Sequence, residues 1–223
     1  MKRPMTLLTL FLTALLVTAP AFAKKYPDVS DDGLQRIDHK SLDAVYWREG
    51  ATLAGYDQVM IDDIEVSFRK NWQRDQNSAR RGASNRVTAE DMTRIREAVA
   101  EGFRDAFVKA LTEAGFEVVD APGDSVLALE PSIVDLDVNA PDISMRQAGR
   151  TNTYTTSAGQ MTLNMALFDS GSNSLIGRVI DERRARDTGQ LQFSNSITNR
   201  QEANLMFRRW ANALVKALQE AEA

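Results

Sequence analysis

Two long stretches with a helical pattern of apolar residues enclose a run of strand-like segments, and this order is the feature that most constrains the fold. The first stretch begins at Thr88, whose hydroxyl can cap the first turn, and ends before Gly115, with apolar residues at spacings of three and four between them. The second repeats the pattern from Ala203 to Leu218. Each helix therefore needs a partner surface for one apolar face.

The remaining segments supply that surface. Residues 56–68 are predicted to form one strand with a bulge at the Asp62-Asp63 pair. Further strand patterns follow at residues 116–119, 126–138, 160–168 and 175–187. Helices with one apolar stripe and a sheet with one apolar face are all buried when both helices cover the same side of the sheet. We therefore predict an α+β fold in two layers, a mainly antiparallel mixed sheet of about four to five strands with two long helices on one face.

The first 23 residues have the three parts of a secretory signal peptide. Lys2 and Arg3 are basic, Thr6 to Val17 is an uncharged apolar run, and small residues precede the expected cut after position 23. The residues that define the cleavage site are Ala21, Ala23 and Lys24. The apolar run has about 12 residues, whereas a membrane-spanning helix needs about 20. We predict cleavage rather than membrane anchoring.

The predicted organisation has three parts. Residues 1–23 are the signal peptide, residues 24–55 an irregular N-terminal segment with turn-forming clusters, and residues 56–223 a single α+β domain. The chain contains no cysteine, which excludes disulfides, thiolate chemistry and acylation of an N-terminal cysteine. A domain of this size can bury enough apolar area without such cross-links.

The charge balance argues against a nucleic-acid partner. The chain has 27 basic and 31 acidic residues, and two of the basic residues lie in the leader, so the mature chain is more acidic still. Binding to a phosphate backbone requires a basic face. An exported, acidic domain instead predicts a partner in the cell envelope, with peripheral membrane contact as a further option and no transmembrane segment in the mature chain.

No residue pattern predicts catalysis. His39 is the only histidine, which leaves neither a Ser-His-Asp triad nor a zinc site. Asp62 and Asp63 are neighbours on a strand and should point to opposite faces, whereas Asp135 and Asp137 should share a solvated face. Residues 169–174 have the composition of a hairpin turn, without the later glutamate of a calcium loop. We therefore predict no catalytic residue, no cofactor, no metal ligand and no enzyme activity.

A basic stretch at residues 69–87 is the main candidate for an interaction site. It is predicted to be a loop, and its basic residues are Arg69, Lys70, Arg74, Arg80, Arg81 and Arg86. Such a run is usually a solvated surface, and the alternative is a docking patch for an acidic partner or an anionic lipid head group. A second cluster contains Arg178, Arg183, Arg184 and Arg186, mixed with Asp181, Glu182 and Asp187. It is interpreted as the solvent face of a strand with cross-strand ion pairs, with binding as the alternative. Met161, Met165 and Met206 are expected in the core.

Four segments resemble a family of bacterial lipoproteins of unknown function, the domain of unknown function 3313 family. They are Gly55–Asp62 (GYDQVMID), Phe68–Trp72 (FRKNW), Leu111–Val119 (LTEAGFEVV) and Leu163–Asp169 (LNMALFD). The resemblance covers most of residues 30–220 and rests on packing and turn residues. It implies an envelope protein and brings no known activity. This chain departs from the family description because it lacks the lipobox cysteine.

Two functional hypotheses follow. The first is an exported, non-enzymatic interaction or accessory module in the periplasm that binds another envelope protein; secretion or peripheral attachment to the envelope is the alternative location. The second is a small-ligand-binding protein or an unrecognised hydrolase, with a site near the 69–87 and 139–159 loops. A deep pocket with inward polar groups would favour the second hypothesis, and a solid core with flat surfaces the first. The oligomeric state is left open by the sequence.

Overall fold

The computed structural model describes residues 26–78, 86–139, 153–155, 159–185, 192–194 and 196–222. Its helices are α1 (Trp72–Ser78), α2 (Ala89–Glu113) and α3 (Ser196–Glu222). Its strands are β1 (Gln35–Ile37), β2 (Ala44–Trp47), β3 (Gln58–Ile61), β4 (Glu65–Phe68), β5 (Glu117–Val119), β6 (Val126–Val138), β7 (Thr153–Thr155), β8 (Gly159–Asp169), β9 (Ser174–Arg184) and β10 (Gln192–Ser194). The α+β class is as predicted.

The main sheet is larger than predicted. It contains eight strands in the order β1-β2-β9-β8-β6-β3-β5, with β4 also paired to β6, instead of about four to five. The long strands β6, β8 and β9 form an antiparallel centre, while β3 and β4 run parallel to β6. A separate pair, β7 and β10, lies beyond the main sheet. The additional strands have only three or four residues, which is too short for a period-two pattern to stand out.

The predicted strand at residues 56–68 is two strands, and a proline explains the break. Asp62 N–H donates to the carbonyl of Leu129 at 2.9 Å, so the next bond of a parallel ladder would need the N–H of Pro131. Proline has none. The carbonyls of Ile61 and Asp62 instead accept hydrogen bonds from Arg104 of α2, at 2.8 and 3.3 Å. The carbonyls left free by the interruption thus connect the sheet to α2 through Arg104.

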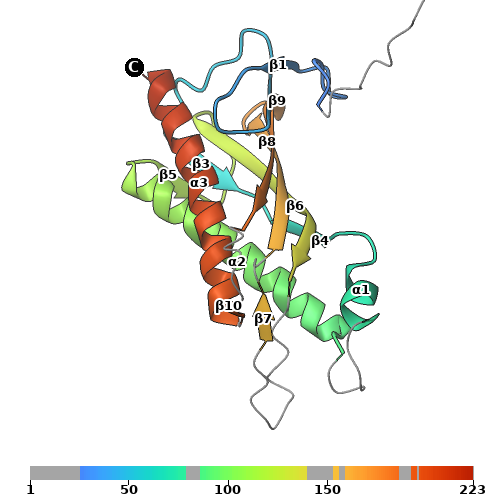
Figure 1. Cartoon of the computed structure of the whole chain (residues 1–223). Coiled ribbons are helices and arrows are strands. Elements are labelled where there is room, and N and C mark those ends of the chain that lie inside the picture. The colour runs from blue at the N-terminus through green and yellow to red at the C-terminus, as the bar shows by residue number, and fades with distance from the viewer. Residues whose placement is uncertain are drawn as a thin grey trace, which may run out of the picture.

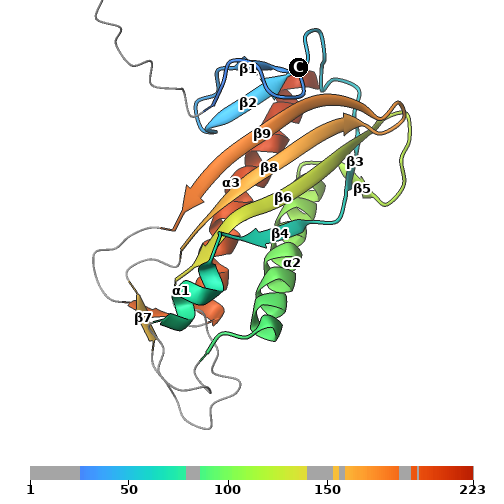
Figure 2. The ribbon, with the colours of Figure 1, turned by 90° about the vertical axis from the view of Figure 1, so that its right-hand side faces the viewer.

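Both long helices cover the same face of the sheet, as predicted (Figures 1 and 2). A single apolar cluster joins Phe103 and Phe107 of α2, Phe207 and Trp210 of α3, and the inner face of the sheet. The methionines Met161, Met165 and Met206 are buried in it, as expected. Among the described residues, no helix is both long and apolar enough to cross a bilayer.

The N-terminal segment 24–55 is not irregular throughout, which corrects the sequence-based expectation. Its strands β1 and β2 extend the sheet, and β2 pairs antiparallel with β9. Tyr46 of β2 packs with Leu34 and Ala44 on the sheet face opposite the helices, and its hydroxyl donates to the carbonyl of Pro27 at 3.0 Å. The turn-forming clusters of this segment precede β1, and β1 and β2 are too short to show a strand pattern of their own.

The basic stretch at 69–87 also differs from the predicted loop, because it contains helix α1. Trp72 begins this helix, is 1% exposed, and stacks on Phe68 with ring centroids 4.2 Å apart. Its indole N–H donates to the carbonyl of Val138 at 3.2 Å. A seven-residue helix with one buried residue is too short to produce a helical stripe in the sequence.

A bulge in β6 changes the environment predicted for the two aspartates near its end. The register shifts by one residue between Val134 and Asp137, and Asp135 has φ 52°, in the left-handed region. Leu136 consequently points into the core. Asp135 is exposed, whereas Asp137 is partly buried and ion-paired, so the two do not form the solvated pair that the sequence suggested.

Candidate ligand-binding cavity

Helices α2 and α3 cross closely at a glycine. A Cβ atom placed on Gly102 would lie 3.0 Å from Asn204 Oδ1 and 3.3 Å from the ring of Phe207, so the missing side chain permits this approach. From the crossing toward their N-termini the two helices diverge (Figure 1). The close crossing at Gly102 and the divergence beyond it therefore leave a wedge-shaped region between α2, α3 and the end of the sheet.

A cavity of about 440 Å³ occupies this wedge. Its apolar lining comes from Ile95, Ala98, Val99, Leu136, Val138, Met161, Ala203, Met206 and Phe207. Its polar lining comes from Arg94, Glu97, Glu101, Asp137, Gln160, Asn199, Arg200, Glu202 and Asn204. Two helices and two strands of the main sheet therefore contribute to one hollow with an apolar wall and a polar rim, which is the usual composition of a small-molecule site.

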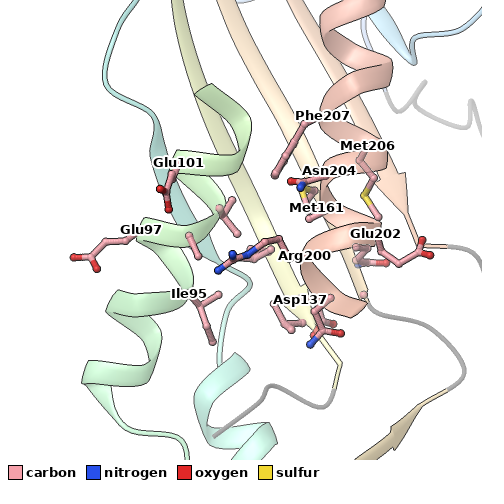
Figure 3. A pocket seen from close by; sticks show the side chains of 18 of the residues that line it. Ile95, Glu97, Glu101, Asp137, Met161, Arg200, Glu202, Asn204, Met206 and Phe207 are labelled. Carbon is pink, nitrogen blue, oxygen red and sulfur yellow. The ribbon is translucent and has the colours of Figure 1, made fainter. Parts of the chain in front are cut away.

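Arg200 is the charged side chain that reaches farthest into the space beside this cavity. It extends from the first half of α3 into the space between the helices (Figure 3). The carboxylates of Glu97 and Glu202 point away from that space. Arg94, in contrast, is ion-paired with Asp91, a buried residue that also closes the capping box with the predicted cap Thr88. The guanidinium of Arg200 thus faces the cavity most directly.

Asp137, at the lower wall of the cavity, is held by Arg69. Arg69 binds Asp137 Oδ2 through Nε at 2.7 Å and Asp75 Oδ2 through a second nitrogen, also at 2.7 Å. The hydrogen bond from Arg69 lowers the pKa of Asp75. The second oxygen of Asp137, Oδ1, is enclosed by protein atoms and has no hydrogen-bond partner within the described parts of the chain. Asp137 is therefore already ion-paired, with a cation that it shares with Asp75.

A second polar centre, which the sequence did not reveal, is buried on the opposite side of α3. Asp181 of β9 is 1% exposed; its Oδ2 accepts from Trp210 Nε1 at 2.7 Å and its Oδ1 from the N–H of Asp43 at 3.0 Å. Arg183 pairs with the same carboxylate. The solvent face expected for Asp181 from the strand pattern is therefore wrong, because α3 covers this carboxylate. The centre links sheet, helix and N-terminal segment, so its role is structural.

A smaller cavity of about 190 Å³ lies beneath the C-terminal half of α3. It is lined almost entirely by apolar side chains, among them Trp47, Leu163, Met165 and Leu214. His39 stands at its edge, and the ring Nδ1 accepts hydrogen bonds from the N–H groups of Ser41 and Leu42 at 3.2 and 3.1 Å. The histidine is thus engaged in a local turn.

The predicted basic patch is divided by the structure. Arg69 and Arg74 form ion pairs with Asp75, Lys70 and Arg86 are exposed, and Arg80 and Arg81 lie outside the described residues. Its role in docking stays a prediction. Of the second cluster, Arg178 pairs with Asp32 at 2.7 Å and Arg184 with Glu182 at 3.5 Å, while Arg186 is not described. Ala21, Ala23 and Lys24 also fall outside the described part.

The carboxylate pairs considered in the sequence are not brought together as a reactive site. Asp62 and Asp63 are both exposed at the break between β3 and β4. Residues 170–173 form the turn between β8 and β9, in which Asp169 Oδ1 accepts from the N–H and hydroxyl of Ser172 at 2.7 and 2.6 Å. No group of three or more potential metal ligands occurs among the residues that the structure describes.

Comparisons with known proteins give a family and weak structural likenesses. A family model described as "Protein of unknown function (DUF3313)" matches residues 21–214. A comparison with curated proteins finds no sequence match.

Three solved structures illustrate the likeness. The PelC dodecamer from Paraburkholderia phytofirmans has 9% identity, covers 74% of this chain and 93% of its own, and gives a TM-score of 0.37. A protein from Xanthomonas campestris has 13% identity, 75% and 86% coverage and a TM-score of 0.38. A minor lipoprotein from Acinetobacter baumannii has 8% identity, 72% and 91% coverage and a TM-score of 0.31. Likeness at this level carries no functional argument.

Proposed function

We propose, from the premise that this chain belongs to the family described as protein of unknown function (DUF3313), that it is a non-enzymatic cell-envelope protein that binds a small amphipathic molecule. The observation that carries this proposal is the cavity between α2, α3 and the sheet, with its apolar wall and polar rim. Its volume of about 440 Å³ falls in the range of small-molecule sites, roughly 300–1,000 Å³.

The cavity favours the second of the two hypotheses that the sequence left open. A ligand binder was expected to have a deep pocket with several polar groups near the 69–87 and 139–159 loops. The observed cavity is bordered by Val138 and Gly159, which lie at the two ends of the second loop. An accessory role with an envelope partner is compatible with ligand binding and forms the wider context of the proposal.

Export to the periplasm is the second part of the proposal, and it rests on the signal-like residues 1–23. Mass spectrometry of the protein from a periplasmic fraction should give a chain that begins at Lys24, without an acyl group. A full-length chain that remains in the cytoplasmic fraction would contradict this part while leaving the cavity proposal intact.

Native mass spectrometry tests the binding function itself. Wild-type protein, purified gently from the envelope fraction, should carry a small-molecule mass in addition to its own. Ala98→Leu places a larger side chain in the cavity and should remove that mass, whereas Ala100→Leu, on the same helix and outside the cavity lining, should retain it. Equal occupancy in both folded variants, or no added mass in the wild type, would overturn the proposal.

A further inference from the structure

The side chain of Arg200 lies where a ligand could contact it. It is exposed, and it makes no ion pair or hydrogen bond with any residue in the described ranges. In Figure 3 its guanidinium reaches from α3 into the cavity. The planar guanidinium offers paired N–H donors that match the oxygens of a carboxylate or phosphate. An anionic group at the cavity mouth would complete this arrangement.

The carboxylates near Arg200 are ion-paired or point away from the cavity, so they do not prevent an anion from binding there. The carboxylate of Asp137 is ion-paired with Arg69 at 2.7 Å, and its second oxygen is enclosed by protein atoms. Glu97 and Glu202 direct their carboxylates away from the space between the helices (Figure 3). The chain as a whole is acidic, with a formal charge of −4, so general attraction of anions cannot substitute for a local cation. The lining also includes Glu101 of α2, so the cavity carries several carboxylates, and Arg200 is the cation that we infer sets the preference at the mouth.

The wall behind Arg200 suits an alkyl chain. Ile95 and Val99 of α2 face Met161 of β8 and Phe207 of α3 across the cavity, and all four side chains are apolar. Methionine and aromatic side chains adapt readily to flexible apolar ligands. An alkyl chain placed there would remove its own surface and that of the wall from water, which is favourable in proportion to the area.

Building on the proposed binding function, we propose that the cavity takes an anionic amphiphile, a single alkyl chain with a terminal carboxylate or phosphate. The head group binds Arg200, and the chain lies against Ile95, Val99, Met161 and Phe207. Fatty acids and phospholipid fragments share this chemistry. The head group of the tightest-binding probe, carboxylate or phosphate, shows which of the two classes the cavity prefers.

Isothermal titration of the mature protein with four probes below their micelle-forming concentrations tests this assignment. Decanoate and decyl phosphate carry the two candidate heads, decanol carries no charge, and decyltrimethylammonium carries the opposite charge. At least one of the two anions should bind roughly tenfold or more tightly than decanol, the factor expected of one charge-assisted hydrogen bond. The cation should bind more weakly than decanol.

Variants of two arginines on the same helix give the matched control. Arg200→Gln should reduce anion affinity roughly tenfold and leave decanol binding unchanged. Arg208→Gln removes the same charge from an exposed position outside the cavity lining and should change neither. Arg200→Lys should recover part of the affinity, since it restores the charge without the paired donors.

The outcomes separate the two proposals. Equal binding of anions and decanol, or equal loss in the Arg200 and Arg208 variants, would reject the anionic ligand while preserving a binding cavity. If none of the probes binds, both proposals fail. Preference for decyltrimethylammonium would likewise reject the role of Arg200.

Discussion

The two halves of the layer between helices and sheet differ sharply, although the same two helices form both. In the more densely filled half, Phe103, Phe107, Leu111, Ala211 and Leu218 have no exposed area, and the cavity there, beneath α3, has only about 190 Å³. In the open half, toward the helix N-termini, Ala98 and Ala203 line a cavity of about 440 Å³. One set of helices thus supplies both a stable core and a candidate binding site.

The difference comes from side-chain size and the helix crossing. In the filled half the rings of Phe103 and Phe107 stack with centroids 4.2 Å apart, and Phe207 meets Phe103 edge-on at 5.7 Å. Gly102 brings the helices together at this level. Beyond the crossing the helices separate, and the alanines are too small to fill the gap. The filled half therefore carries most of the packing energy and leaves the open half available for a ligand.

Truncation of core residues should give the largest contrast between the halves. Phe107→Ala in the filled half should reduce the free energy of unfolding by about 3–5 kcal/mol. Ile95→Ala removes a partly buried side chain beside the cavity and should cost about 1 kcal/mol, since fewer packed neighbours are lost. Urea denaturation measures both values. Equal costs would contradict the distinction between filled and open halves.

The buried carboxylate of Asp181 anchors the filled half to the N-terminal segment. Asp181→Ala leaves Trp210 Nε1 and the N–H of Asp43 without their acceptor and Arg183 without its ion-pair partner, and should cost about 3 kcal/mol or more. Trp210→Phe removes one of these bonds and should cost less. Thermal unfolding followed by circular dichroism measures which of the two variants loses more stability. An Asp181→Ala variant as stable as the wild type would show that the network adds little.

Enlarging one alanine in each half should sharpen the comparison. Ala211→Leu adds three carbon atoms to a site with no exposed area and should cost about 1–3 kcal/mol by overpacking. Ala98→Leu enters the cavity and should change the free energy of unfolding by less than about 0.5 kcal/mol. A large destabilisation by Ala98→Leu would mean that the open half has no usable space.

The smallest expected effect concerns a polar contact at the edge of the filled half. Tyr56 donates to Asp169 Oδ2 at 2.8 Å, and hydrogen bonds from Ser172 and then Tyr56 lower the pKa of Asp169. A lowered pKa stabilises the fold above the ordinary carboxylate pKa of about 4, and that stability is lost as the pH falls through the folded-state value.

The measurement is denaturation of the wild type and Asp169→Asn at several pH values. The stability advantage of the wild type should be present at pH 6 and should shrink on acidification below about pH 4. An advantage that does not change with pH would show that ionised Asp169 is not the stabilising form.

The parts that the sequence predicted are those with strong local patterns. The helix at 89–113 repeats its apolar residues over 25 positions, and Thr88 caps it as expected. The hairpin of β8 and β9 follows from alternation and a turn-forming composition. The short strands β1, β2 and β5 have no such periodicity, and only their pairing across the chain defines them.

The candidate site was only partly predictable, for a different reason. The second hypothesis placed a ligand site near residues 139–159, whose two ends border the cavity, yet Arg200, Ala98 and Gly102 have no motif that marks them. Their role depends on where two helices cross, which is a tertiary property. Likewise, Asp181 appeared to lie on a solvent face because strand alternation alone does not reveal that Trp210 covers it.

The central claim, that the open half is the ligand site, is tested most directly by methionine-methyl NMR during titration with decanoate. Met161 and Met206 line the cavity, whereas Met165 is buried beside the smaller cavity beneath α3. We predict saturable shifts of the Met161 and Met206 methyl signals, with Met165 unchanged, and loss of these shifts in Ala98→Leu. Shifts confined to Met165, or no shift at saturating decanoate, would contradict the claim.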